Sequence, residues 1–264
     1  MLESGALDGI DAALLLVAAN AHRPRLTGAP AGRLLELRFT GRASHAASAP
    51  ERGVNALEGA LGTFVLVNAL RQHLPIGSRI DGVVSNGGAA PNIVPENAAA
   101  RFWVRTPGPV SLRRVTRRLL RSAESSAAAA GATVEHEERC RAFLNLIDCP
   151  PLGEPMAEAW HRVYHDEPNG PWALPYPTDF GNVSHVIPSL LMPFWVADAP
   201  PKTPEFAAAT MTDAAVEAAA RAALAYALGI ATLLATPAAI AAGAADLAAR
   251  QERLRSFAAS AGEF

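Results

Sequence analysis

Between residues 34 and 139, segments that alternate apolar and polar residues, as strands do, are interspersed with segments whose apolar residues have helical spacing. The order of these segments constrains the fold most. Residues 34–41 alternate apolar and polar side chains, as a half-buried strand does. Residues 54–74 carry apolar side chains at helical spacing and end before Pro75. The series is completed by strands over 79–85 and 98–106, a helix over 111–130 and a strand over 133–139.

The resulting order, β-α-β-β-α-β, is that of the split βαβ or ferredoxin-like motif. We therefore predict a small independent domain over residues 32–141. Beyond it we expect a helix over 152–166, a strand over 190–196 and a helix over 211–234.

The flanking segments have α/β character but few strands. Residues 1–31 offer one more strand, around 12–18, and one clear strand follows the inserted domain. The predicted fold class is thus α/β (α+β), with a ferredoxin-like domain inserted between residues 1–31 and 142–236 of an incomplete α/β domain. Residues 237–264 are expected to form an alanine-rich helical tail.

Composition limits the partners of this chain. Half of its 264 residues are hydrophobic and its net charge is −2, which favours a globular core and gives no reason to expect binding to nucleic acid or an anionic membrane. Two cysteines without a CxxC spacing predict a reducing, cytoplasmic setting. The uncharged stretch 222–245 is mostly alanine, so we expect a packed helix and no membrane span.

Three short motifs occur in order along the chain. The first is Thr40-Gly-Arg-Ala-Ser-His45, the second is Gly87-Gly-Ala-Ala-Pro-Asn92-Ile-Val-Pro, and the third begins at Thr178 and reads Thr-Asp-Phe-Gly-Asn. Together they resemble the M20 peptidase family, and above all its branch of aminobenzoyl-glutamate hydrolases and M20-domain dipeptidases. The resemblance covers residues 1–236.

The resemblance implies a two-domain enzyme that hydrolyses amide bonds in N-acyl amino acids or dipeptides. In that family a catalytic α/β domain binds two zinc ions, and an inserted lid domain mediates dimers. Residues 32–141 would be the lid, and a homodimer through it is expected. The start of the chain looks like the middle of a longer family sequence, just before the lid.

The same resemblance assigns roles to side chains of the lid. His45 would reach the active site of a partner subunit and stabilise the oxyanion. Arg105 would bind a substrate carboxylate, for which a guanidinium fork is suited. Asn92 would donate to the same substrate group. From the residues alone, a surface histidine, a solvated charge at a strand end and a turn-forming asparagine stay open as alternatives.

Asp179, in the third motif, could line the substrate cleft or cap a helix, and both readings stay open. Pro177 stands where the family often has serine. His161 and His165 are four residues apart, which can bind zinc on a helix, but a solvated helix face is favoured. Five arginines between 113 and 121 are expected to form a solvated face.

The metal ligands of the family are largely missing. Its His-x-Asp motif does not occur before the lid, and the only Glu-Glu pair is Glu137-Glu138 on a lid strand. Lys202 stands where the resemblance places the last ligand histidine, and an ammonium has no lone pair for zinc. We therefore expect no metal site and no cofactor in this chain as it stands, and no activity from it alone.

Two other hypotheses stay open. One is a non-catalytic module for dimerisation or carboxylate binding. The other is an active hydrolase whose start was wrongly assigned, against which Lys202 argues.

Overall fold

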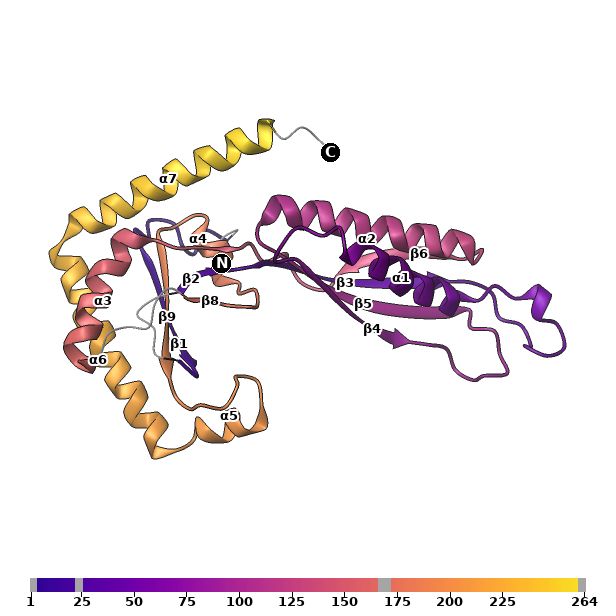
Figure 1. The fold of residues 1–264 in the computed structure, drawn as a ribbon, viewed down its shortest axis with the longest axis horizontal. Helices are drawn as coiled ribbons and strands as arrows, with labels where there is room; N and C mark the ends of the chain where they lie inside the picture. The colour runs from indigo at the N-terminus through magenta and orange to yellow at the C-terminus, as the bar shows by residue number, and fades with distance from the viewer. Residues whose placement is uncertain (1–3, 22–25, 166–171, 261–264) are drawn as a thin grey trace. The chain divides into compact units, whose positions relative to one another are not determined.

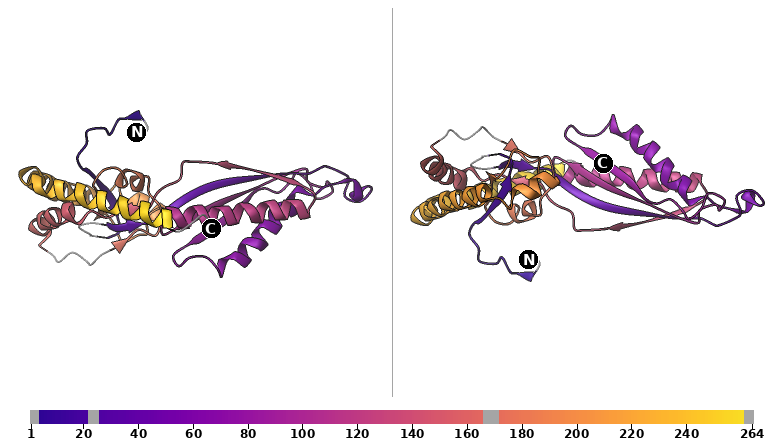
Figure 2. Two further views of the ribbon diagram at one scale, coloured as in Figure 1. Left: turned by 90° about the horizontal axis from the view of Figure 1, so that it is seen from above. Right: turned by 90° about the horizontal axis from the view of Figure 1, so that it is seen from below.

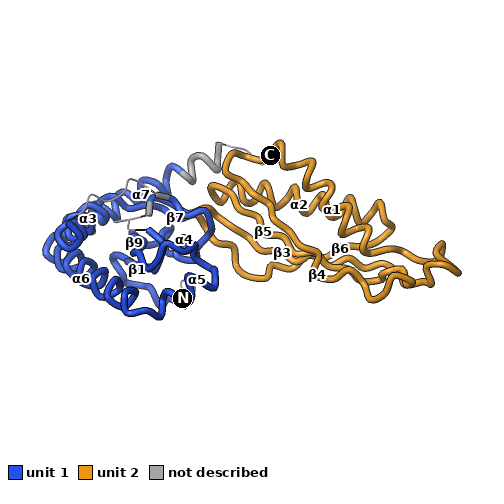
Figure 3. The backbone as a smooth tube through the Cα atoms, turned by 60° about the horizontal axis from the view of Figure 1, so that its bottom comes forward, with its two compact units in different colours: residues 1–29, 146–264 blue, residues 30–145 orange. Residues whose placement is uncertain are grey.

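The computed structural model describes residues 4–21, 26–165 and 172–260. The chain divides into two compact units (Figure 3). Residues 30–145 form one, which we call the lid unit, and residues 1–29 together with 146–264 form the other, which we call the α/β unit.

The lid unit has the predicted order of strands and helices. Its elements are β3 (Ala31–Thr40), the short 3-10 helix η2 (Pro50–Arg52), α1 (Ala56–Arg71), β4 (Arg79–Asn86), β5 (Asn97–Thr106), α2 (Pro109–Ala129) and β6 (Thr133–Glu138). The strands form one antiparallel sheet in the order β4-β5-β3-β6. This is the ferredoxin-like topology, so the predicted fold class of the lid is confirmed.

Local sequence explains where the lid helices begin and turn. The Asn55 side chain accepts a hydrogen bond from the Leu57 amide and so caps α1. Pro109 occupies the first turn of α2, where its missing N–H costs nothing. After α2 the chain reverses at Gly131, whose φ of +71° is a conformation that side chains disfavour.

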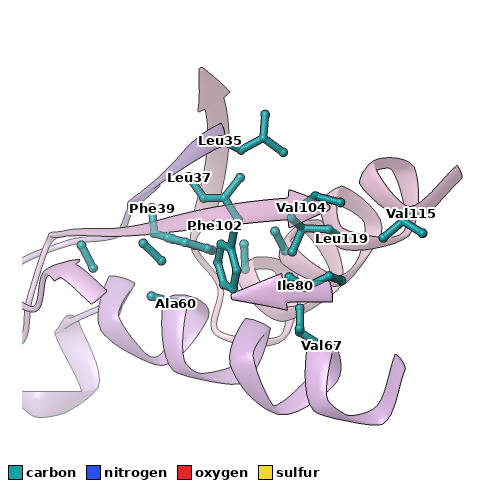
Figure 4. Close-up of a cluster of buried hydrophobic side chains, with 14 of the residues drawn as sticks. Leu35, Leu37, Phe39, Ala60, Val67, Ile80, Phe102, Val104, Val115 and Leu119 are labelled. Atoms are coloured by element: carbon teal, nitrogen blue, oxygen red, sulfur yellow. The ribbon is translucent and has the colours of Figure 1, made fainter. Parts of the chain in front are cut away.

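The core of the lid lies between the sheet and its two helices. Both helices lie on the same face of the sheet, as the two views of Figure 2 show. Alternate residues of β3 and β5 point into this core, among them the fully buried Leu37 and Phe102 (Figure 4). Phe64 of α1 packs on Phe102, with 4.7 Å between the ring centroids.

The face of the lid sheet opposite the helices carries charge. Glu36 of β3 is only 8% exposed, yet its carboxylate lies 3.4–3.6 Å from the guanidinium groups of three arginines, Arg38, Arg101 and Arg139. A buried carboxylate is tolerated because these cations surround it.

The α/β unit is built around a two-stranded parallel sheet. β1 (Ala13–Ala19) pairs in register with β9 (Ser189–Trp195), from Ala13 opposite Ser189 to Ala19 opposite Trp195. These two strands confirm the strands predicted around residues 12–18 and over residues 190–196. The remaining elements are β2 (Leu26–Ala29), β7 (Leu146–Ile147), α3 (Pro150–Tyr164), β8 (Trp172–Ala173), α4 (Phe180–Ser184), α5 (Pro204–Ala209), α6 (Asp213–Ala235) and α7 (Pro237–Ser260) (Figure 1).

Three details of this unit differ from the sequence prediction. The short strands β2, β7 and β8 form a second sheet, in the order β7-β2-β8, that was not predicted. The predicted helix over 152–166 ends earlier, because His165 takes a left-handed φ of 56° as its C-cap. His161 and His165 therefore do not share one helical face.

Helix α6 is long and apolar enough to cross a membrane, by length and composition alone, and 22% of its most apolar stretch is buried within the unit. Its small residues pack on α3: Gly229 lies so close to Met156 that a β-carbon would come within 2.3 Å of its sulfur. The expected alanine-rich tail forms α7, which contacts the same unit at Gly243, beside Cys149 and Leu152.

Candidate functional site

His45 and Asn92 are brought together at one end of the lid sheet. His45 lies in the loop after β3 and forms an isolated β-bridge with Ile93. The Ala46 amide donates to the carbonyl oxygen of Asn92 at 2.9 Å. Two motifs that are about forty-five residues apart in the sequence thus form a single two-loop tip.

The hydrogen bonds of His45 fix which ring nitrogen is available. Its Nδ1 accepts from the amides of Ala47 and Ser48, each at 3.2 Å. A nitrogen that accepts from two N–H groups carries no proton, so the neutral ring holds its proton on Nε2. The side chain is exposed, and its Nε2–H is therefore a suitable donor to an oxygen atom of a ligand.

An open pocket of about 400 Å³ adjoins this tip. It is lined by the following residues: Asn55, Leu57, Gly87, Gly88, Ala89, Ala90, Pro91, Ile93 and Pro95. Gly88 has a φ of +99° and packs on Pro95, so the Gly-Gly pair shapes the loop. Ile93 belongs to both the pocket and the bridge to His45, which joins the pocket to the tip.

Arg105 lies near the other end of β5. Its guanidinium contacts the carboxylate of Asp81 on the neighbouring strand β4 and lies 5.6 Å from the ring centre of Trp103. The ion pair and the aromatic contact hold the guanidinium on the open face of the sheet. Eight residues separate Arg105 from the first residue of β5, so along the strand it is roughly 26 Å from the end where His45 lies.

The α/β unit contains the other two predicted positions. Asp179 is the N-cap residue of α4, but its side chain makes no capping hydrogen bond. Lys202 has a left-handed φ of 70°, and its ammonium lies 4.7 Å above the ring of Tyr176. Burial raises the pKa of the Tyr176 phenol above its ordinary value. Lys202 and Tyr176 thus form a cation–π contact.

The described residues do not fit a two-metal centre. Within residues 4–21, 26–165 and 172–260 no three His, Cys, Asp or Glu side chains gather in a way that could hold a metal ion. The Glu137-Glu138 pair is engaged by Arg38, Arg139 and Arg33 on the lid sheet.

The contacts of Arg105 with Asp81 and Trp103 were not predicted from the sequence. Asp81 and Trp103 face each other across β4 and β5, and Phe143 lies with its ring centroid 6.0 Å from that of Trp103. Only the strand register brings these side chains together. The signal available in the sequence was a tryptophan two residues before Arg105 on the same face of a strand.

The chain thus consists of a ferredoxin-like unit inserted into an α/β unit, with a histidine loop at one end of the inserted sheet. Residues 34–129 match the peptidase dimerisation domain family. The lid unit is therefore a peptidase dimerisation domain, and the resemblance of the motifs to the M20 peptidase family is confirmed.

Several relatives are similar over much of the chain. The Xaa-Arg dipeptidase of Mus musculus is 29% identical over 222 residues, which are 81% of this chain and 51% of that protein. One of the p-aminobenzoyl-glutamate hydrolase subunits of Escherichia coli (strain K12) is 29% identical over 54% of this chain and 31% of its own length. The chain spans about half the length of the first of these relatives.

Solved structures share the fold. The aminobenzoyl-glutamate utilization protein from Klebsiella pneumoniae superimposes with a TM-score of 0.61 at 21% identity, covering 85% of this chain and 57% of that one. An amidase of the hydantoinase/carbamoylase family from Burkholderia vietnamiensis gives a TM-score of 0.60 at 19% identity, over 81% and 54% of the two chains.

Proposed function

We propose that this chain is the lid-bearing portion of an M20-family amidohydrolase that acts on N-acyl amino acids or dipeptides, and that by itself it binds such molecules without hydrolysing them. The observation that carries the first half is the pairing of His45 with Asn92 at the tip of a dimerisation domain. The observation that carries the second is Lys202, which stands where the resemblance places the last ligand histidine and whose side chain lies above the ring of Tyr176.

The two ends of the lid offer complementary chemistry. An N-acyl amino acid has a carboxylate and, a few bonds away, an amide carbonyl. Arg105 suits the carboxylate because its planar fork can donate two parallel hydrogen bonds. The Nε2–H of His45 suits the carbonyl oxygen, where negative charge develops when the amide is attacked. Within one lid the two groups are too far apart to act on one such molecule.

A dimer resolves this separation, and the lid has a surface for it. β4 is an edge strand that pairs only with β5 among the described residues. Exposed apolar side chains gather along it and on the adjacent helix α1, at Leu61, Val65, Val83 and Val84. The other edge strand, β6, carries Glu135, Glu137 and Glu138, which discourage strand pairing. We propose that a second copy of this chain adds to the β4 edge.

The geometry of such a dimer joins the two ends. If two β4 strands pair antiparallel about a two-fold axis at Gly82, Arg79 of one copy lies opposite Ser85 of the other. Arg79 is the cross-strand neighbour of Arg105, and Ser85 lies two residues before the Gly-Gly pocket loop. The tip of one lid then approaches Arg105 of its partner, which gives two composite sites in each dimer.

Binding and turnover test the two halves of the proposal separately. We expect the purified chain to bind N-acetylglycine, and Arg105→Ala to abolish this binding while Arg113→Ala, an exposed arginine on α2, leaves it intact. We expect no release of amino acid from N-acyl amino acids or dipeptides with added Zn²⁺ or Mn²⁺. Turnover by the isolated chain would refute its inactivity, and binding that survives Arg105→Ala would remove the carboxylate role.

Binding and turnover also bear on the two alternatives, a non-catalytic module and an active hydrolase with a longer chain. Arg105-dependent binding without turnover under any metal supply would agree equally with a non-catalytic carboxylate-binding module. Only restoration of turnover, by a polypeptide that carries the remaining half of the relatives' length, distinguishes the two. An in-frame His-x-Asp motif encoded upstream of Met1 would support an active hydrolase with a longer chain.

A further inference from the structure

Five arginines of helix α2 lie on one face of that helix, which we call the arginine face. They occupy positions 113, 114, 117, 118 and 121, and at 3.6 residues per turn these fall within roughly 140° of arc. Four of them are exposed, and Arg118 is half-buried. The opposite face of α2 is buried in the lid core through Val115 and Leu119 (Figure 4). The arginine face therefore points into solvent.

The net charge of −2 for the whole chain conceals an uneven distribution. Residues 30–145, the lid unit, contain 15 arginines, no lysine and nine aspartates and glutamates. The lid unit therefore carries a charge of +6, and the rest of the chain carries −8. Without the arginine face, the lid would have ten arginines against nine acidic residues. The excess positive charge of the lid is thus concentrated on one helix face that is roughly 12 Å long.

Intramolecular contacts do not neutralise the arginine face. Arg113, Arg114 and Arg121 make no ion pair or hydrogen bond with another residue that the structure describes. Arg118 donates to the backbone carbonyl oxygen of His73, just after the end of α1, at 3.2 Å, and this carbonyl has no net charge. Glu124 is the one acidic residue in the sequence of α2, and it follows Arg121 by three residues. The charge of the face is therefore available to a partner.

The spacing of the arginines disfavours the unbound helix. Arg113, Arg117 and Arg121 follow one another at intervals of four residues, as do Arg114 and Arg118, and like charges at this interval destabilise a helix. A bound polyanion removes this repulsion. The same interval repeats the charges about every 6 Å along a line, which suits a ligand whose anionic groups also repeat along a line.

The residue types on α2 distinguish among polyanions. Guanidinium groups donate two parallel hydrogen bonds to a phosphate, and arginine is the only cation here. The helix has no Trp, Tyr or Phe, so unpaired bases would find no ring on which to stack. None of its large apolar side chains is exposed, so it offers nothing to insert into a membrane. These features favour a duplex, whose bases are already stacked.

We infer that the arginine face binds the phosphate backbone of double-stranded DNA without regard to sequence. The major groove of DNA is wide enough to admit a helix, whereas that of duplex RNA is deep and narrow. Contacts to phosphate carry no sequence information, and α2 has no Asn or Gln with which to read adenine. This binding is separate from the proposed hydrolase function and does not depend on it.

The test titrates the full chain into a short duplex that carries a fluorescent label and reads the anisotropy at several salt concentrations. We expect micromolar binding at about 50 mM salt that weakens roughly 50- to 500-fold by about 200 mM, because three to five phosphate contacts release counterions. A second duplex of unrelated sequence should bind equally well. The same duplex should raise the melting temperature of the chain at low salt.

A double variant locates the contact. Arg114→Gln combined with Arg121→Gln should weaken binding at low salt roughly ten- to hundredfold, and should reduce the slope of log affinity against log salt by about two. The matched control, Arg52→Gln combined with Arg162→Gln, removes the same charge from two exposed arginines outside α2. It should leave both affinity and slope nearly unchanged, because salt screens distant charges.

Folding is checked by thermal melts. The double variant on α2 relieves repulsion between like charges, so in the absence of DNA it should melt no lower than the unmodified chain. Binding that is lost in a variant of unchanged melting temperature is then lost through the missing guanidinium groups.

Several outcomes would overturn the inference. They are an absence of binding at low salt, an unchanged salt slope in the double variant on α2, and an equal loss of affinity in the control pair. Polyglutamate that binds as tightly as the duplex would assign the arginine face to an acidic protein. Phosphatidylserine vesicles that bind as tightly would assign it to a membrane surface, and tighter binding of a single strand would exclude the duplex.

Discussion

His45 and Arg105 lie at opposite ends of the same antiparallel sheet, roughly 26 Å apart along β5. The first is exposed on the loop that follows β3, and the second is held by Asp81 and Trp103 near the end of β5. No molecule as small as an N-acyl amino acid spans this distance. If both residues contact one ligand, they must come from different copies of the lid.

This relationship predicts the result of mixing two defective variants. In a dimer of His45→Ala with Arg105→Ala, one composite site has lost both residues and the other retains both. Random pairing at equal amounts makes half of the dimers mixed, so about one quarter of the wild-type number of high-affinity sites should return. The number of sites is read from a calorimetric titration with N-acetylglycine.

Each variant measured alone is the control and should show weakened binding at every site. If the two residues acted within one chain, no mixture could regain a high-affinity site. An unchanged titration after mixing and re-equilibration would therefore contradict the composite arrangement.

The β4 edge and α1 are predicted to hold the dimer. Val65 is 67% exposed and Val83 is 60% exposed, and a charge at either position would have to be buried in the interface. Val65→Glu and Val83→Glu should each weaken association by roughly ten- to hundredfold. Light scattering after gel filtration should report a monomer at concentrations where the unmodified chain has twice the mass.

The matched control places the same charge on another exposed apolar residue. Met211 lies in the α/β unit and is 85% exposed. Met211→Glu should leave the dimer intact. Dissociation by this variant, together with persistence of the dimer in Val83→Glu, would move the interface away from the lid.

The lid was predictable from the sequence because its signals are local. Alternation in 34–41 and 98–106 and the helical period of 54–74 each depend on one face being buried, and the structure buries Leu37, Phe102 and Val67 on those faces. The α/β unit was harder to predict. Strands β7 and β8 have two residues each, which is too short for any periodicity, and only pairing with β2 defines them.

The candidate site was predictable only in part, for the same reason. The motifs point to His45 and Asn92 as members of one loop pair, and the structure brings them together. The surroundings of Arg105 depend on the register between β4 and β5, which places Asp81 opposite Trp103. Register is set by packing and turn geometry across the whole sheet, so a single strand does not reveal it.

Glu36 is predicted to stabilise the lid through the three arginines around it. Glu36→Gln keeps the shape of the side chain but removes the charge, which leaves Arg38, Arg101 and Arg139 to repel one another. The arginines are partly exposed, so solvent screens part of the effect, and we expect a loss of about 1–2 kcal/mol in the free energy of unfolding.

Urea unfolding followed by circular dichroism gives this value. Glu135→Gln is the matched control, because Glu135 is an exposed carboxylate on β6, and its effect should stay within about 0.5 kcal/mol. Equal losses in the two variants would show that the arginine cluster contributes nothing specific.

Tyr226 should make the α/β unit sensitive to alkali. This tyrosine of α6 packs on the core that contains Met156 and Trp160, and burial raises its pKa from 10.0 to about 12. The unfolded chain therefore loses its phenolic proton first as the pH rises. The stabilisation is complete below pH 10 and is lost as the pH rises through about 12.

Two measurements at each pH test this prediction. The ultraviolet absorbance of the phenolate should show the raised pKa of Tyr226, and chemical unfolding should show the loss of stability. Tyr226→Phe should flatten this dependence, leaving the smaller slope expected from Cys149 and Tyr176, whose pKa values burial also raises. An unchanged slope in Tyr226→Phe would show that the alkaline transition has another origin.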